Sequence, residues 1–148
     1  MSATLKDFTA AIRARLETLT GAGAALEGVA LLIEDAPELE LKINAAIEET
    51  GALMLIGRAS FSNKGDARHA AHQELRSEIA VGENPLLWRT NGKPTCDQIA
   101  DQVVGALQGF AITGFAPLEI LDGHPVPDKE RQLFEIIVRS SRIIQKTT

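Results

Sequence analysis

The sequence predicts an α+β fold: a mixed, mostly antiparallel sheet with about three helices packed on one of its faces. Three observations lead to this class. Apolar residues recur at helical spacing in three stretches, polarity alternates at strand spacing in others, and two pairs of strands follow one another directly, which favours antiparallel neighbours. With 148 residues and 45% hydrophobic content, residues 1–148 are expected to form a single domain with its own core.

The first part of the chain is predicted to fold as a helix, a strand and a second helix. The first helix covers residues 4–19, because apolar residues recur there every three or four positions: Leu5, Phe8, Ile12, Leu16 and Leu19. A glycine-rich connection at 21–26 leads to a short apolar strand at 29–33. The second helix starts after Asp35, which can cap its first amides, and Gly51 suits a left-handed residue at its C-terminal end.

The middle of the chain is predicted to be two strands joined by an exposed loop. Residues 52–60 form the first strand, and the polar stretch 61–71 forms the loop. Polarity then alternates over 72–81, which predicts a strand that buries Leu75, Ile79 and Val81. The opposite face of this strand meets water or a partner and carries His72, Glu74, Arg76 and Glu78.

The last part of the chain is predicted to be a helix followed by a hairpin. Thr95 and Gln98 form a capping box, and the buried stripe of the helix that follows is Ile99, Val103, Leu107 and Phe110. A strand at 117–121 and the longest strand, at 133–144, pair as a hairpin. The long loop between them, residues 122–130, holds two prolines and is predicted to lie outside both strands.

Composition and charge disfavour several classes of protein. The net charge is −5 and no basic cluster offsets it, so we expect no sequence-specific binding of nucleic acid. A lone Cys96 forms no internal disulfide, which indicates folding in a reducing compartment such as the bacterial cytoplasm. The first residues have no secretory signal, and no apolar run is long enough to span a bilayer.

No set of residues predicts catalysis, a metal site or a cofactor site. Cys96 begins a predicted helix, where a thiol pKa can fall, but no general base is placed beside it. His69 and His72 follow Asp66 at three-residue spacing, yet they span a loop and a strand instead of one helical face. The glycines at 21, 23 and 28 follow a helix and precede a strand, the wrong context for a phosphate loop.

Three regions are predicted to contact other proteins. Both long loops exceed the usual length of a hairpin loop, and extended loops often become ordered against a partner. The mixed charges on the 72–81 strand can fix the register with a second copy of the chain. The candidate contact residues are Asn63, Lys64, Asp66 and Arg68 in the first loop, Glu74, Arg76 and Glu78 on the strand, and His124, Asp128 and Lys129 in the second loop.

The segment 83–110 resembles small tail proteins of tailed bacteriophages and prophages, and within that group the tail terminator, or tail completion, proteins. These proteins often show a strand that ends near Glu-Asn-Pro and then a helix that starts with Thr. Leu87 and Trp88 stand where the family has a more polar residue. The matching residues here are Glu83-Asn84-Pro85, Arg89, Gly92, Thr95, Ile99-Ala100, Val103, Ala106-Leu107 and Gly109-Phe110.

The resemblance implies a non-enzymatic α+β subunit of the virion tail. Such subunits form a ring, usually of six copies, at the end of the tail tube, where they stop tube polymerisation. The implied partners are further copies of the chain, the tail tube protein and head connector proteins. A head-closure or minor tail protein at the same joint is the alternative within this class. A small cytosolic enzyme with Cys96 as nucleophile and a small-ligand binding domain are the alternatives outside it.

Overall fold

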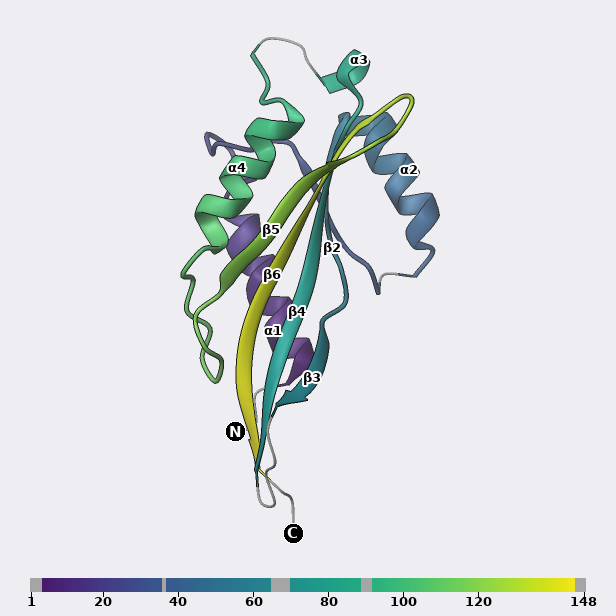
Figure 1. The fold of residues 1–148 in the computed structure, drawn as a ribbon. Helices are drawn as coiled ribbons and strands as arrows, with labels where there is room; N and C mark the ends of the chain where they lie inside the picture. The colour runs from purple at the N-terminus through teal and green to yellow at the C-terminus, as the bar shows by residue number, and fades with distance from the viewer. Residues whose placement is uncertain (1–3, 36, 65–69, 89–91, 146–148) are drawn as a thin grey trace.

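The computed structural model describes residues 4–35, 37–64, 70–88 and 92–145 (Figure 1). Its elements follow the predicted order, with one additional short strand and one additional short helix. They are α1 (Leu5–Glu17), β1 (Ala30–Ile33), α2 (Leu39–Thr50), β2 (Ala52–Ile56), β3 (Ser60–Lys64), β4 (Ala70–Glu83), α3 (Pro85–Trp88), α4 (Cys96–Leu107), β5 (Glu119–Val126) and β6 (Gln132–Gln145).

The six strands form one mixed, mostly antiparallel sheet, which confirms the predicted fold class. The strand order is β1-β2-β4-β6-β5, and β3 pairs with the part of β4 that β2 leaves uncovered. Among the described strands, β1 and β2 are parallel, and every other pair is antiparallel. The two 14-residue strands β4 and β6 pair along their whole length and form the long axis of the molecule in Figure 1.

The main core lies between one face of the sheet and the helices α1 and α4. Alternating residues of β4 and β6 supply the sheet side of this core, and the helices supply their predicted apolar stripes. Phe8 of α1 is fully buried, and its ring lies 5.1 Å from that of Phe115, centroid to centroid. Both helices begin with capping boxes, at Thr4 and at Thr95, and the second confirms the predicted start.

Helix α2 lies on the other face of the sheet, so the prediction that all helices share one face was wrong. It connects the parallel strands β1 and β2 and packs against both of them. Its one buried residue, Ile47, lies outside the main core cluster, as does Leu53, which alternates with the core residues Ala52 and Met54 on β2. In Figure 1, α2 therefore stands on the opposite side of the strands from α4.

The two ends of α2 differ in how well the sequence predicted them. Asp35 does not cap the helix; Glu38 is the residue before its first turn, with a left-handed φ of 55° and no side-chain cap. Gly51 has the predicted left-handed conformation, with φ 87°. A Cβ atom at Gly51 would lie 2.9 Å from the backbone nitrogen of Trp88, so this close approach to α3 also requires glycine.

The predicted loop at 61–71 is partly a strand, which corrects the prediction. Residues Ser60–Lys64 form β3, which pairs antiparallel with β4, whereas β2 ends at Ile56. The pairing shifts by one residue between Ile56↔Ile79 and Ser60↔Arg76, so β2 and β3 act as one strand with a bulge at 57–59. All five side chains of β3 are exposed, and a strand without a buried face gives no alternating hydrophobic signal.

The predicted loop at 122–130 is also shorter than expected, because β5 continues to Val126 and contains Pro125. Only residues 127–131 connect it to β6. Proline is tolerated here because β5 is the edge strand of the sheet, where an outward-facing position needs no N–H group. The predicted hairpin between the last two strands is confirmed.

Candidate assembly surface

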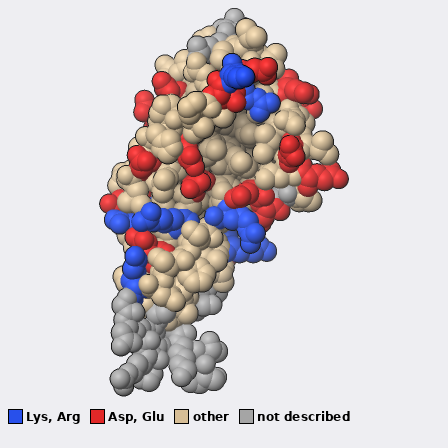
Figure 2. All heavy atoms as spheres, turned by 45° about the vertical axis from the view of Figure 1, so that its right-hand side comes forward, with Lys and Arg blue, Asp and Glu red and all other residues tan. Residues whose placement is uncertain are grey.

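The sheet face that points away from α1 and α4 carries charged side chains along β4, β5 and β6. We call the part of it formed by β4, β5 and β6 the outer face. The alternation predicted for β4 is confirmed: Glu74, Arg76 and Glu78 point to this side, while Leu75 and Ile79 are fully buried on the other. Lys and Arg side chains form a band across the middle of the surface seen in Figure 2, with Asp and Glu gathered mainly above it.

Glu74 is the centre of a network of ion pairs on the outer face. Its carboxylate lies 3.4 Å from a guanidinium nitrogen of Arg76 and 3.4 Å from one of Arg139, and 3.9 Å from Lys64 Nζ. Arg76 and Arg139 lie directly opposite each other on paired strands. Two like charges in this position repel each other, and the carboxylate of Glu74, which contacts both, offsets the repulsion. Arg139 also binds Glu119 on β5, and this bond raises the pKa of Arg139 above its ordinary value.

A second group of charged side chains lies next to this network on the outer face and is predominantly acidic. The carboxyl group of Glu78 shares a hydrogen bond with that of Glu135, which raises the pKa of Glu78, and partial burial adds to the increase. His124 lies beside this pair, and its ring nitrogens are 3.4 Å from Glu135 and 3.3 Å from Asp122. The outer face thus carries a network of three cationic and two acidic side chains beside a predominantly acidic group.

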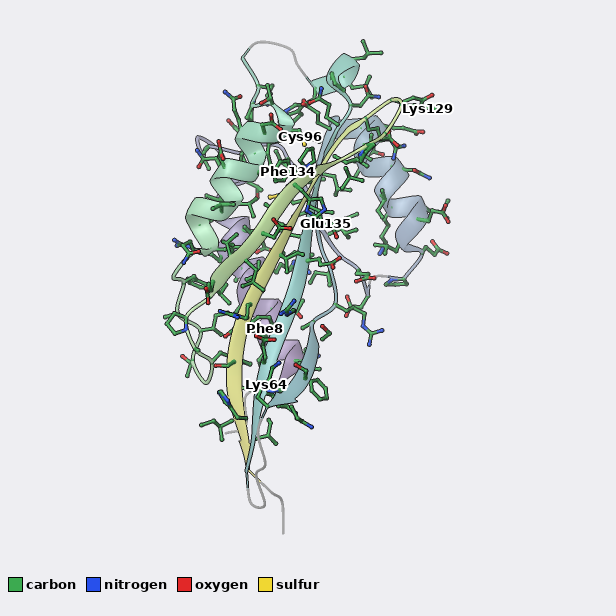
Figure 3. The ribbon with its side chains drawn as sticks, in the orientation of Figure 1. Phe8, Lys64, Cys96, Lys129, Phe134 and Glu135 are labelled. Carbon is green, nitrogen blue, oxygen red and sulfur yellow. The ribbon has the colours of Figure 1, made fainter. Side chains whose placement is uncertain are left out.

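The structure does not bring all predicted contact residues together. Asn63 and Lys64 lie on β3 at one end of the molecule, whereas Asp128 and Lys129 lie in the turn at the opposite end (Figure 3). His124 belongs to strand β5 and to the outer face, not to a loop. Asp66 and Arg68 lie outside the described residues.

Asp128 has a structural role in its turn. Its carboxylate accepts hydrogen bonds from the backbone amides of Glu130, at 3.1 Å, and Arg131, at 2.8 Å. A side chain that caps its own turn in this way shapes the connection from β5 to β6. The neighbouring Lys129 is exposed and has no ion pair among the residues that the structure describes.

Cys96 has the surroundings of a core residue. Its side chain is 1% exposed, and its thiol is directed at the carbonyl of Val81, 3.7 Å away. His72 and His124 both lie on the other side of the sheet, and His69 is outside the described residues. Within the described ranges, no three His, Cys, Asp or Glu side chains are grouped closely enough to hold a metal ion.

Glu83 is an important residue that the sequence analysis did not single out for its own chemistry. It ends β4, is fully buried, and accepts a hydrogen bond of 2.8 Å from the Cys96 amide at the start of α4. The carboxylate therefore ties the end of the strand to the N-terminus of the helix. A signal was present in the sequence: Glu83 has the same alternation parity as the buried Ile79 and Val81.

Asn84 extends this connection, which explains why Glu83-Asn84-Pro85 precedes a capped helix. Its backbone amide binds the carbonyl of Gly51, and its side chain caps α3 by accepting from the amide of Leu86. Trp88 then donates its ring N–H to the carbonyl of Pro94 at 2.6 Å. The residues that carry the resemblance thus hold the fold together at the point where sheet, α3 and α4 meet.

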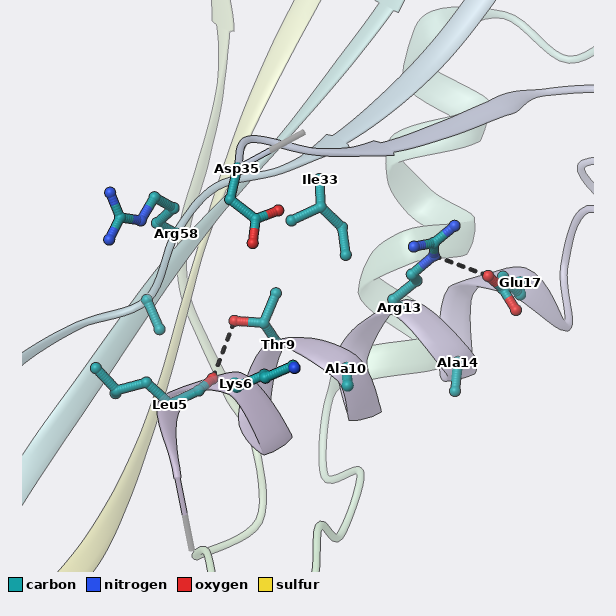
Figure 4. Close-up of a pocket in the computed structure, with 11 residues that line it drawn as sticks. Leu5, Lys6, Thr9, Ala10, Arg13, Ala14, Glu17, Ile33, Asp35 and Arg58 are labelled. Carbon is teal, nitrogen blue, oxygen red and sulfur yellow. Dashed lines mark hydrogen bonds and ion pairs between the residues drawn. The ribbon is translucent and has the colours of Figure 1, made fainter. Parts of the chain in front are cut away.

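A groove of about 560 Å³ runs between α1 and the bulge after β2 (Figure 4). Side chains on the exposed side of α1 form one wall of the groove. Ile33, Arg58 and Ala59 lie on the other wall. Arg13 and Glu17 on its rim form an ion pair at 2.9 Å. The groove mixes apolar and charged groups without a buried polar group aimed into it. Its lining is Leu5, Lys6, Thr9, Ala10, Arg13, Ala14, Glu17, Ile33, Asp35, Arg58 and Ala59.

No family model matches the sequence, and no curated protein matches it. Comparison with solved structures gives a different result. The chain shares its fold with a subunit in the structure of the virion of a native gene transfer agent particle, with a TM-score of 0.66 and 19% sequence identity. The alignment covers 97% of this chain and 99% of that one. None of the helices in the described ranges is long and apolar enough to cross a membrane.

Proposed function

We propose that this protein is a structural subunit of a phage-type virion, and that it forms a ring at the end of the tail tube, stops tube polymerisation and joins tail to head. The observation that carries the proposal is the shared fold with a gene transfer agent virion subunit over essentially the whole of both chains. Fold similarity alone does not assign a role, so the surface must also suit the task.

Two features of the surface support an assembly role. The outer face presents fixed, paired charges on rigid strands, which suits the recognition of a protein surface in one register. The long sheet exposes distinct surfaces at its two ends, as a subunit needs when it contacts two different neighbours. Contacts between unlike surfaces of identical subunits close into a ring when the rotation between neighbouring subunits closes on itself.

The charge of the chain is compatible with a position along the path of DNA. A net charge of −5 repels the phosphate backbone, so a ring of such subunits would let DNA pass without holding it. A head-closure or minor tail protein at the same joint has the same requirements and is the second candidate. The position of the ring, at the tube end or on the connector, separates these two roles.

The first test is the mass of the purified protein in solution, alone and mixed with tail tube protein from the same genome. Native mass spectrometry should show a closed oligomer, and electron microscopy should show rings at one end of each tube. Tubes should stop growing when the protein is added. A protein that stays monomeric in both conditions and leaves tube length unchanged contradicts the proposal.

Arg76 provides a mutational test of the outer face. Arg76→Glu reverses a charge that contacts Glu74, and its side chain is about half exposed, so folding should be retained while assembly is impaired. Lys42→Glu is the matched control, because Lys42 is exposed on α2 and is not among the candidate contact residues. Assembly of Arg76→Glu at the native level would remove the outer face from the interface.

A further inference from the structure

The helices α1 and α4 form one layer on the core face of the sheet, and the two margins of this layer differ. α1 packs against β1 and α4 packs against β4, β6 and β5, so α1 lies toward the β1 edge and α4 toward the β5 edge. Arg13 of α1 lines the groove, whereas Arg15 donates to the carbonyl of Ala106 on α4. Side chains two positions apart on a helix point in nearly opposite directions. The groove is therefore on the side of α1 that faces away from α4.

The other margin of the layer is a row of exposed residues on α4 and its C-cap. We call this row the acidic stripe: Asp97, Asp101, Gly105 and Gln108. Spacings of four, four and three positions place these residues on one side of the helix. Gln108 identifies that side, because its side chain accepts a hydrogen bond of 3.0 Å from the amide of Ile120 on β5. The stripe thus faces the β5 edge, away from α1.

The two margins carry charges of opposite sign. Asp97 and Asp101 are the only charged residues of α4, and neither has an ion pair in the described part of the chain. The lining of the groove includes three cationic side chains and two carboxylates. Arg13 already has an ion pair on the rim, but Lys6 and Arg58 are exposed and have none among the residues that the structure describes. Two unpaired carboxylates at one margin therefore complement two unpaired cations at the other.

Gly105 of the acidic stripe provides a separate observation. A glycine inside a helix makes that helix less stable than an alanine would, so its presence often has a packing reason. Its own chain gives no such reason: among the described residues, an added Cβ atom would have no heavy atom within 4 Å. The α1 wall of the groove also has small side chains, Thr9, Ala10 and Ala14. A glycine on one surface and alanines on the other allow two helices to approach closely.

We propose that the acidic stripe of one copy of this chain docks into the groove of the next, so that α4 lies beside α1 of the neighbouring subunit. This inference rests on the proposed ring and specifies how its subunits join. The contact is head to tail, because the two surfaces are unlike and lie at opposite margins of one layer. It leaves the outer face available to other virion proteins.

The positions of the two surfaces also define how the subunits are oriented. In a closed ring, the line that joins the two contact surfaces of a subunit is perpendicular to the ring axis. The groove includes Arg58, just before β3, whereas Asp97 lies beside Cys96 near the opposite end of the sheet (Figure 3). The long strands β4 and β6 are therefore inclined to the ring axis.

A charge swap between two variants tests this contact. The stripe variant combines Asp97→Asn with Asp101→Lys, because a lysine in the first turn would oppose the helix dipole. The groove variant combines Lys6→Glu with Arg58→Glu. Each variant alone brings like charges together, so ring formation should need a protein concentration about tenfold higher or more, measured by native mass spectrometry. An equimolar mixture should assemble at the native concentration, because every contact in an alternating ring again joins opposite charges.

Gly105→Leu tests the close approach of the helices without a change of charge. Leucine is a better helix former than glycine, and its side chain would point into open space in the monomer, so the Tm should not fall. Ring formation should still be weakened by about tenfold or more, because the new side chain occupies the space of the neighbouring α1. Glu48→Lys, on the exposed side of α2, is the control for a change of charge and should assemble like the native protein.

Cross-linking of the native protein gives a measurement that needs no variant. A carbodiimide joins an amine to a carboxylate that is already in contact with it. It should link Lys6 to Asp97 or Asp101 of another chain, seen as dimers on denaturing gels and identified by peptide mass spectrometry. If a variant loses its native circular dichroism spectrum, this measurement decides, and assembled rings without the link overturn the contact.

The outcomes separate this contact from the proposed function. Rings of both variants at the native concentration, or a mixture of folded variants that does not assemble, overturn the contact and leave the proposed function standing. Loss of assembly in the groove variant alone would mean that another protein fills the groove, which also overturns the docking of a second copy. A native protein that stays monomeric with and without tail tube protein overturns both.

Discussion

The turn between β4 and α4 and the other end of the sheet are built in opposite ways. We call that other end the arm: β3 with residues 70–76 of β4 and 139–145 of β6. At the turn, a fully buried carboxylate, a capping box and a tryptophan hydrogen bond connect three elements. In the arm, the core gives way to a polar network, in which Gln73 binds Asn63 at 2.8 Å and Arg142 at 2.9 Å. One region is closed on itself, and the other ends in open edges.

This difference separates the residues that make the sequence recognisable from those that we propose make contacts. Glu83, Asn84 and Thr95 belong to the resemblance and have their partners inside the chain. The side chains of β3 belong to no motif, and all five are exposed. A sequence pattern that identifies a fold therefore does not have to include the residues that contact a partner.

Substitution of two phenylalanines should give the largest difference in stability loss between the main core and the arm. Phe8→Ala empties a fully buried site against Phe115 and should lower the free energy of unfolding by about 3–5 kcal/mol. Phe61→Ala removes a half-exposed ring that contacts Arg142, and should lower it by less than about 1 kcal/mol. Denaturant titration measures the free energy of unfolding of both variants. Equal losses would mean that the arm is packed as tightly as the main core.

The contact between Gly51 and Trp88 gives the next largest effect. Gly51→Ala combines a left-handed backbone with a Cβ atom 2.9 Å from Trp88 and should cost about 2–4 kcal/mol. Gly109→Ala is the matched control: its φ is 76°, but nothing lies within 4 Å of the added atom, so about 1 kcal/mol is expected. Equal losses for the two variants would rule out a steric role for the Trp88 contact.

Removing the Glu83 carboxylate should weaken the turn by a smaller amount. Glu83→Ala leaves the buried Cys96 amide without its acceptor and should cost about 2 kcal/mol, measured by denaturant titration. Glu83→Gln keeps an oxygen at the same position and should recover part of the loss. An alanine variant as stable as the native protein would show that this bond does not hold α4 to the sheet.

The acidic pair on the outer face should give the smallest effect, with a defined pH dependence. Because the pKa of Glu78 is raised, the folded protein binds this proton more readily than the unfolded chain, and stability falls as the pH rises through that range. Glu78→Gln should therefore raise the Tm at about pH 7, by less than about 2 °C at this exposed site, and leave it unchanged below about pH 4.

Glu74→Gln is the control of opposite sign. Glu74 contacts three cationic groups, so its removal should lower the Tm near neutral pH. Thermal unfolding followed by circular dichroism across this pH range measures both variants. A decrease in Tm for Glu78→Gln near neutral pH would contradict the raised pKa of that carboxyl group.

The sequence predicted those elements whose signal is local. The capping box at Thr95, the apolar stripe of α1 and the alternation of β4 are contained in a few residues each, and all are present in the structure. β3 and the second half of β5 were missed because their strand character comes from pairing with β4 and β6. A strand with no buried side chain, or with a proline on its free edge, has no local signal.

The candidate site was less predictable than the fold for a related reason. Glu74, Arg76 and Glu78 share a face because they alternate along one strand, and this the sequence shows. Lys64 and Arg139, which contact Glu74, and Glu119, which contacts Arg139, come from three other strands. Only the sheet register places these side chains together. Asp128 and Lys129 lie far from that network because β5 is longer than predicted.

Electron microscopy of particles made with and without the gene tests the central claim most directly. If the protein ends the tail tube and joins it to the head, deletion should leave filled heads separate from tails, and the tubes should vary in length. Supplying the native gene in trans should restore joined particles. Joined particles with tails of native length, produced in the absence of the protein, would contradict its role as a subunit of the tail.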